Sequence, residues 1–114
     1  MKLEYLDLED GIRLIKLNGR LDMDGTTSID KQFVQHCAGE KAFVLVDLSQ
    51  VNYLSSIGIP LLITTAKAVA NRGGRMAFLN PQSNVKSVLD LTGVSTMIRI
   101  YKDLKTARER LMSA

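Results

Sequence analysis

The amino-acid sequence predicts a single α/β domain built on a mixed, mostly parallel β-sheet. Residues 42–46 form an unbroken apolar run, of the kind that a parallel sheet buries on both faces. Segments with strand character alternate with segments of helical periodicity along the chain. The length of 114 residues and the hydrophobic content of 46% fit one domain with a real core. We therefore expect one domain over residues 1–114.

The N-terminal third predicts a hairpin followed by a helix. Two strands, Lys2–Leu8 and Ile12–Leu17, flank an Asp-Gly pair that favours a tight turn. Asn18-Gly19 is expected to end the second strand. Apolar residues then recur at every fourth position up to Cys37, which predicts one helix face. The helix is expected to begin at Thr26, where one of three consecutive hydroxyl residues would cap it.

The rest of the chain alternates strands with helices. After the apolar run at 42–46, helical spacing from Ile59 to Val69 predicts a second helix, which Ser56 would cap. The further expected elements are a strand at Met76–Asn80, a helix at Gln82–Leu91, a strand at Thr96–Tyr101 and a helix containing Leu104, Ala107 and Leu111. About four helices would therefore pack on a sheet that begins with a hairpin strand.

The charge pattern does not predict a nucleic-acid-binding protein. The net charge is +3, but the basic residues are scattered and few aromatic residues are available to stack on bases. The exception is a basic cluster that helical spacing places on the solvated face of the last helix: Lys102, Lys105, Arg108 and Arg110. No segment reaches the roughly 20 apolar residues of a membrane span, and the N-terminus has no signal-peptide core. We expect a cytoplasmic protein.

Few residues suggest catalysis or metal binding. The only histidine, His36, lies beside the apolar stripe of the first helix and is interpreted as a packing or surface residue. The only cysteine, Cys37, falls on that stripe and is interpreted as a small buried hydrophobe. No spacing indicates a metal site or a phosphate-binding loop. We expect no enzyme activity, catalytic residue, metal or cofactor.

Two adjacent serines stand between a strand and a helix in VNYLSSIGIPLLIT, residues 51–64. A helix cap, a nucleophile and a residue that is chemically modified are the three possible roles. A nucleophile would need histidine and acid partners, which one histidine hardly provides. A cap would explain Ser56, but it needs neither Gly58 nor Pro60, which weaken the start of the helix. An open helix start would suit a surface that another protein approaches closely.

Three motifs resemble the STAS domain of bacterial anti-sigma factor antagonists, over about Leu3 to Leu111. They are LNGRLD at 17–22, VLVDLSQVNYLSSIGI at 44–59 and NPQSNVKSVLDLTG at 80–93. In that family a strand ending in D-L-S precedes a serine that opens a helix two residues before a glycine. The partner phosphorylates this serine, which matches Ser56. The best-known members have Asp directly before it, where this chain has Ser55, which makes Ser55 the second choice.

The resemblance implies a binding switch. The unphosphorylated domain would bind an anti-sigma factor, itself an ATP-using serine kinase, and so free a sigma factor for transcription. Phosphorylation would end the binding and a serine phosphatase would restore it. The domain would contact no nucleic acid, would not insert into a membrane, and would be a monomer or weak dimer alone. The alternatives are a STAS subunit of a lipid-transport ABC complex or of a stress-signalling assembly.

The resemblance and the open helix start together suggest which residues form the partner surface. They are Asp22, Ser55, Ser56, Gly58 and Ile59. Asp22 matches a loop position beside the phosphorylated serine, although an ordinary turn residue would look the same. Ile59 could offer an apolar contact, although its helical spacing favours a core position.

Overall fold

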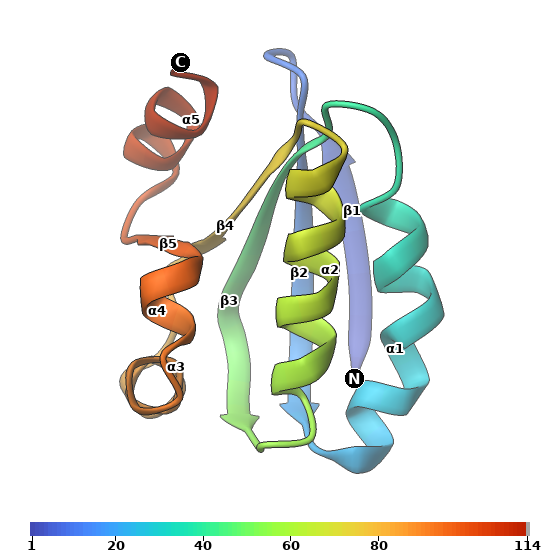
Figure 1. The fold of residues 1–114 in the computed structure, drawn as a ribbon. Coiled ribbons are helices and arrows are strands. Elements are labelled where there is room, and N and C mark those ends of the chain that lie inside the picture. The colour runs from blue at the N-terminus through green and yellow to red at the C-terminus, as the bar shows by residue number, and fades with distance from the viewer. Residues whose placement is uncertain (114) are drawn as a thin grey trace.

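The computed structural model describes residues 1–113 and consists of a five-stranded sheet with helices on both faces (Figure 1). The strands lie in the order β1-β2-β3-β4-β5; β1 runs antiparallel to β2, and the other neighbouring pairs are parallel. The prediction of a mixed, mostly parallel sheet with an N-terminal hairpin strand is confirmed. The elements are β1 (Lys2–Asp7), β2 (Ile12–Leu21), α1 (Met23–His36), β3 (Phe43–Leu54), α2 (Ile59–Asn71), β4 (Arg75–Leu79), α3 (Ser83–Leu91), α4 (Val94–Met97), β5 (Arg99–Tyr101) and α5 (Leu104–Met112).

The central strand β3 is buried on both faces, as the apolar run predicted. Val44, Val46 and Leu48 belong to the larger core, which α1 and α2 cover together with α3. Leu45 points to the opposite face and belongs to a smaller core beneath α5. Successive side chains of a strand alternate between the two faces, so one apolar run serves both cores.

Strand β2 continues past its predicted end, and β3 extends well beyond the apolar run at 42–46. Asn18-Gly19 does not end β2; the register against β3 shifts on either side of this pair, and the strand runs on to Leu21. Gly19 has a φ of +124°, a backbone conformation that glycine adopts readily, so the pair forms an irregularity within the strand. The longer strands carry the chain to a common edge, where α1 and α2 both begin (Figure 1).

Two further expectations about the elements are wrong. Helix α1 begins three residues before Thr26, because the Asp22 side chain caps it. The expected strand at Thr96–Tyr101 divides into the single turn α4 and the short strand β5, so the described residues form five helices where about four were expected. Gly93, at φ +80°, lets the chain start this extra turn directly after α3.

Candidate partner-binding site

Two loops meet at the edge of the sheet where β2 and β3 end (Figure 1). The first joins β2 to α1 through Asp22, and the second joins β3 to α2 through residues 55–58. The Leu21 carbonyl oxygen accepts two hydrogen bonds from Ser55, one from its backbone N–H at 3.1 Å and one from its Oγ at 3.0 Å. The structure thus brings together the two loops to which the sequence assigned the candidate site.

The two serines have different surroundings. Ser55 is half-buried, and its hydroxyl donates to the neighbouring loop. Ser56 is exposed, and its side chain has no hydrogen bond to any residue within 1–113. The carbonyl of Ser55 accepts from the N–H of Gly58 at 3.0 Å, which closes a turn with Ser56 at its outer side. The hydroxyl of Ser56 is therefore the accessible one.

Ser56 does not cap α2. The helix begins at Ile59, and its N-cap position is Gly58, which has no side chain to accept a hydrogen bond. Pro60 occupies the first turn, where its missing N–H costs little. No side chain of the described residues satisfies the free N–H groups at the start of α2, and these groups favour an anion nearby.

Asp22 has a defined structural role at the site. Its Oδ1 accepts from the backbone N–H of Gly25 at 2.8 Å, and its Oδ2 accepts from Arg20 Nε at 3.3 Å. The hydrogen bond from Gly25, assisted by the Arg20 guanidinium, holds the pKa of the Asp22 carboxyl below its usual range. Asp22 is therefore an ionised N-cap that holds the start of α1 to the end of β2.

Gly25 is required for this arrangement. A Cβ atom at this position would clash with the carbonyl oxygen of Arg20. The first turn of α1 therefore approaches the end of β2 as closely as only a glycine allows. Sequence reasoning missed this residue, because nothing in its spacing distinguishes it from a glycine in an ordinary turn.

Gly58 and Ile59 lie beneath the surface of the site. Ile59 is only 8% exposed and belongs to the larger core, which agrees with the alternative reading of its helical spacing. A Cβ on Gly58 would lie 3.1 Å from Leu54 Cδ1 and 3.3 Å from Leu21, so this glycine permits tight packing and does not leave the helix start open. Little of either residue can touch a partner.

The exposed apolar side chains at this edge belong to other residues. Ile57 is 46% exposed and Met23 is 62% exposed, one in each of the two loop regions. Sequence reasoning missed both. The signal was available for Ile57, since it lies two positions before Ile59 and therefore falls off the inward stripe of α2.

The residues considered for catalysis have structural roles. The ring of His36 packs against Tyr5, with their centroids 4.2 Å apart. Cys37 is fully buried, and this burial raises the pKa of its thiol to about 12, against the opposing effect of Arg72 and Arg13. Residues 1–113 contain no group of three or more His, Cys, Asp and Glu side chains that could hold a metal ion. None of the described helices is long and apolar enough to cross a bilayer.

Comparison with known proteins identifies the family of this domain. Residues 6–107 match the model of the STAS domain, so the chain belongs to the STAS domain family. It is similar to a Thermotoga neapolitana protein provisionally named an anti-sigma factor antagonist, at 28% identity over 60% of this chain and 60% of that one.

Solved structures of other proteins share the fold. An anti-sigma-factor antagonist (STAS) domain protein from Planctomyces limnophilus superposes with a TM-score of 0.87 at 19% identity, covering 97% of this chain and 98% of that one. The Bacillus cell fate determinant SpoIIAA in its phosphorylated form superposes with a TM-score of 0.67 at 17% identity, covering 96% of this chain and 98% of that one.

Proposed function

We propose that this chain is an anti-sigma factor antagonist whose partner binding is switched by phosphorylation of Ser56. The observation that carries the proposal is the exposed, unbonded hydroxyl of Ser56 at the start of α2, next to the loop that Asp22 fixes. The naming of a relative as an anti-sigma factor antagonist and the phosphorylated state of a structural neighbour support it. In this scheme the domain acts by binding in the cytoplasm and catalyses nothing.

The partner is an anti-sigma factor that is itself an ATP-using serine kinase. The unphosphorylated domain binds this kinase and so frees a sigma factor for transcription. Transfer of phosphate to Ser56 ends the binding, and a serine phosphatase restores it. The three accessible parts of the surface are Asp22, the serine turn and the exposed side chains Ile57 and Met23. Gly58 and Ile59 support this surface from below.

The charge of a phosphate explains how such a switch changes binding while the fold survives. A phosphoserine carries roughly −1.5 to −2 charges at neutral pH. At the start of α2 the uncapped N–H groups and the helix dipole favour this charge, so the domain tolerates it. A partner that covers Ile57 would have to bury the same charge without water, which is costly.

The modified residue is tested by incubating the domain with its cognate kinase and ATP and mapping the phosphate by mass spectrometry. Phosphate is expected on Ser56, and Ser56→Ala is expected to accept none. Ser55→Ala is the matched control and should still be phosphorylated, because its neighbour keeps an exposed hydroxyl. Phosphate on Ser55 in the wild-type protein would show that Ser55, and not Ser56, is the modified residue. No phosphate from a demonstrably active kinase would favour a transport-complex subunit.

The effect on binding is tested by calorimetric titration with the unphosphorylated kinase. Ser56→Ala should bind as the wild type does, whereas Ser56→Asp should bind more weakly because its carboxylate places charge in the interface. Ile57→Ala should weaken binding about tenfold, the loss of 1–2 kcal/mol that an apolar interface anchor typically causes. Leu6→Ala is the control, since Leu6 is 55% exposed on β1, away from the two loops. Equal losses for Ile57→Ala and Leu6→Ala would place the interface elsewhere.

A further inference from the structure

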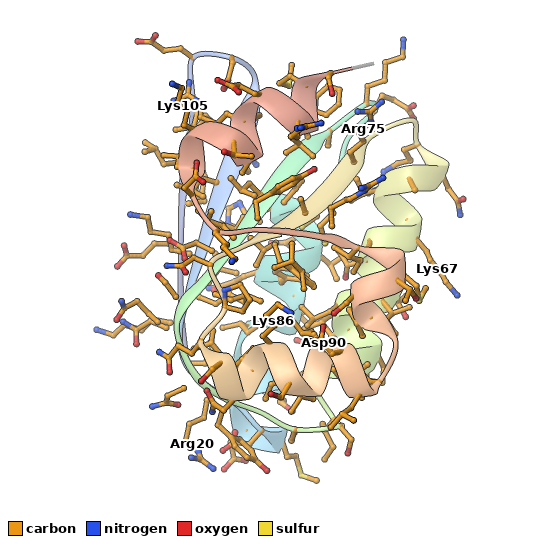
Figure 2. All side chains as sticks on the ribbon, turned by 90° about the vertical axis from the view of Figure 1, so that its left-hand side faces the viewer. Arg20, Lys67, Arg75, Lys86, Asp90 and Lys105 are labelled. Atoms are coloured by element: carbon orange, nitrogen blue, oxygen red, sulfur yellow. The ribbon has the colours of Figure 1, made fainter. Side chains whose placement is uncertain are left out.

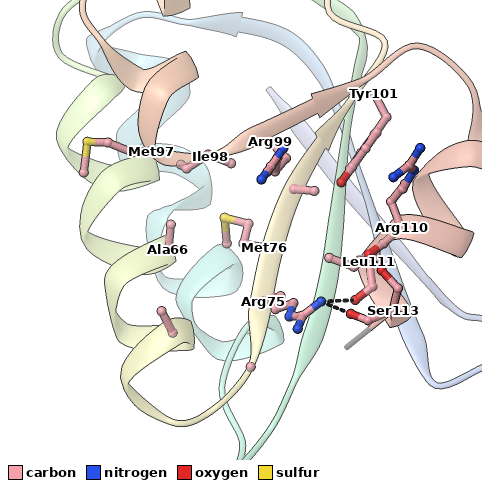
Figure 3. A pocket seen from close by; sticks show the side chains of 13 residues that line it. Ala66, Arg75, Met76, Met97, Ile98, Arg99, Tyr101, Arg110, Leu111 and Ser113 are labelled. Carbon is pink, nitrogen blue, oxygen red and sulfur yellow. Dashed lines mark hydrogen bonds between the residues drawn. The ribbon is translucent and has the colours of Figure 1, made fainter.

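A groove opens beside the short edge strand of the sheet, between α2, β4, β5 and the end of α5 (Figure 3). Strand β5 pairs with β4 only from Ala77 to Leu79, so no strand lies beside Arg75 and Met76 on this side. Small residues of α2, Ala66 and Ala70, leave the space unfilled from the helix side. The resulting cavity has a volume of about 510 Å³.

Positively charged side chains dominate the polar lining of this groove. Arg75, Arg99 and Arg110 come from three different elements, and no Asp or Glu lines the cavity. None of the three arginines forms an ion pair with a residue in the described range 1–113. Like charges that gather with no carboxylate among the described residues repel one another, so an anion in the groove would relieve an unfavourable arrangement.

The three arginines differ in the hydrogen bonds that their side chains make within the domain. Arg75 donates through one Nη to the carbonyl oxygens of Leu111 and Ser113 at the end of α5, which fixes its position (Figure 3). Arg99 and Arg110 are exposed, and their guanidinium groups have no hydrogen-bond partner among the described residues. Tyr101 extends between Arg99 and Arg110 (Figure 3).

We propose that this groove binds a small organic phosphate. The planar guanidinium fork matches the oxygens of a phosphate group, and the side-chain donors of Arg99 and Arg110, which have no partner within residues 1–113, can bind one. A volume of about 510 Å³ lies within the roughly 300–1,000 Å³ of typical small-molecule sites and leaves room for more than a phosphate group. Met97 also lines the groove and is 53% exposed, so it provides apolar contact for the carbon part of the ligand.

This site is separate from the proposed partner surface. Ala70 follows Ile59 by eleven residues along α2, which corresponds to about 16 Å of helix. Figure 2 shows the same separation, with Arg20 and Arg75 at opposite ends of the molecule. The inference does not depend on phosphorylation of Ser56, and it goes beyond the proposed function.

The test is a titration of the ¹⁵N-labelled chain with phenyl phosphate, followed by NMR. Saturable shifts are expected at the amides of Ala70, Met76 and Arg99. Inorganic phosphate should bind at the same amides more weakly, because it lacks the apolar part. Benzoate should bind more weakly than phenyl phosphate, because a single carboxylate carries less charge. Shifts centred on Ile57, at the start of α2, would overturn the proposal, as would equal affinity for the three anions.

Two double variants distinguish specific binding in the groove from nonspecific attraction of anions to a positively charged protein. The Arg99→Gln/Arg110→Gln variant should bind phenyl phosphate at least about tenfold more weakly, since each lost charge-assisted hydrogen bond corresponds to a tenfold change or more. The control is Lys16→Gln/Lys31→Gln, which removes the same charge from exposed positions outside the groove. Its affinity should be unchanged, and an equal loss in both variants would overturn the proposal.

Discussion

The hydrogen bond from Ser55 Oγ to the Leu21 carbonyl oxygen joins the two loops of the candidate site, and Ser55→Ala removes it. A neutral hydrogen bond of this kind contributes about 0.5–1.5 kcal/mol. The Leu21 carbonyl keeps the bond from the Ser55 backbone N–H, so no buried acceptor is left unsatisfied and the loss should be about 1 kcal/mol. Ser56→Ala removes no hydrogen bond among the described residues, and its free energy of unfolding should stay within about 0.5 kcal/mol of the wild type.

Urea denaturation monitored by circular dichroism measures both variants in one assay. With a slope of about 2 kcal/mol per molar urea, Ser55→Ala should lower the midpoint by about 0.5 M, and Ser56→Ala should leave it nearly unchanged. The slope should be the same for all three proteins, which shows that they unfold from equally compact states. If Ser56→Ala destabilises the domain by 1 kcal/mol or more while Ser55→Ala does not, then Ser56 caps α2 after all and the assignment of the two hydroxyls is reversed.

The further predictions concern the core, the cap of α1 and the thiol. Val46→Asp buries an unpaired charge in a fully buried strand and should prevent folding; cooperative melting near the wild-type temperature would contradict this. Asp22→Ala should cost about 0.5–2 kcal/mol in urea denaturation, whereas Thr26→Val should cost nothing, because the buried Thr26 hydroxyl has no hydrogen-bond partner among the described residues. Because the folded-state pKa of Asp22 is lowered, the wild type should have a larger free energy of unfolding than Asp22→Asn above about pH 4, and this difference should disappear as the pH falls through the folded-state pKa. A difference in free energy of unfolding that stays constant down to about pH 2 would refute this. Cys37 should not react with a thiol reagent at pH 8 until the chain unfolds, and fast labelling of the folded protein would contradict its burial.

The layered fold could be predicted because its signals are local. The apolar run at 42–46, the four-residue spacing of α1 and the helical spacing of α2 are properties of neighbouring residues, and the structure buries most of those side chains. The ends of β2 and β3 could not be predicted in this way. Asn18-Gly19 usually marks a turn, but here the adjacent strand continues alongside and provides backbone partners beyond the pair.

The candidate site was predicted at the level of loops and less well at the level of side chains. The motifs placed Asp22 and the serines at one edge of the sheet, and the Leu21–Ser55 contacts join those loops. The exposure of Ile57 depends on where α2 begins, which its N-cap decides. Sequence reasoning placed that cap at Ser56, two residues before the N-cap Gly58, and gave no role to the exposed Ile57 between them.

The bonding of the two serines also bears on which of them can act as a switch. A phosphate on Ser55 would have to break the bond to the Leu21 carbonyl and would place a dianion beside the oxygen that now accepts this proton. A phosphate on Ser56 breaks no bond of the turn, because Ser55 continues to join the loops and the Gly58 N–H continues to bond the Ser55 carbonyl. The added negative charge would then oppose a partner that covers Ile57. Within the domain, the free N–H groups at the start of α2 would stabilise the phosphate. Ser55 joins the two loops, whereas the Ser56 side chain has no bond within residues 1–113. This difference favours Ser56 as the site of modification.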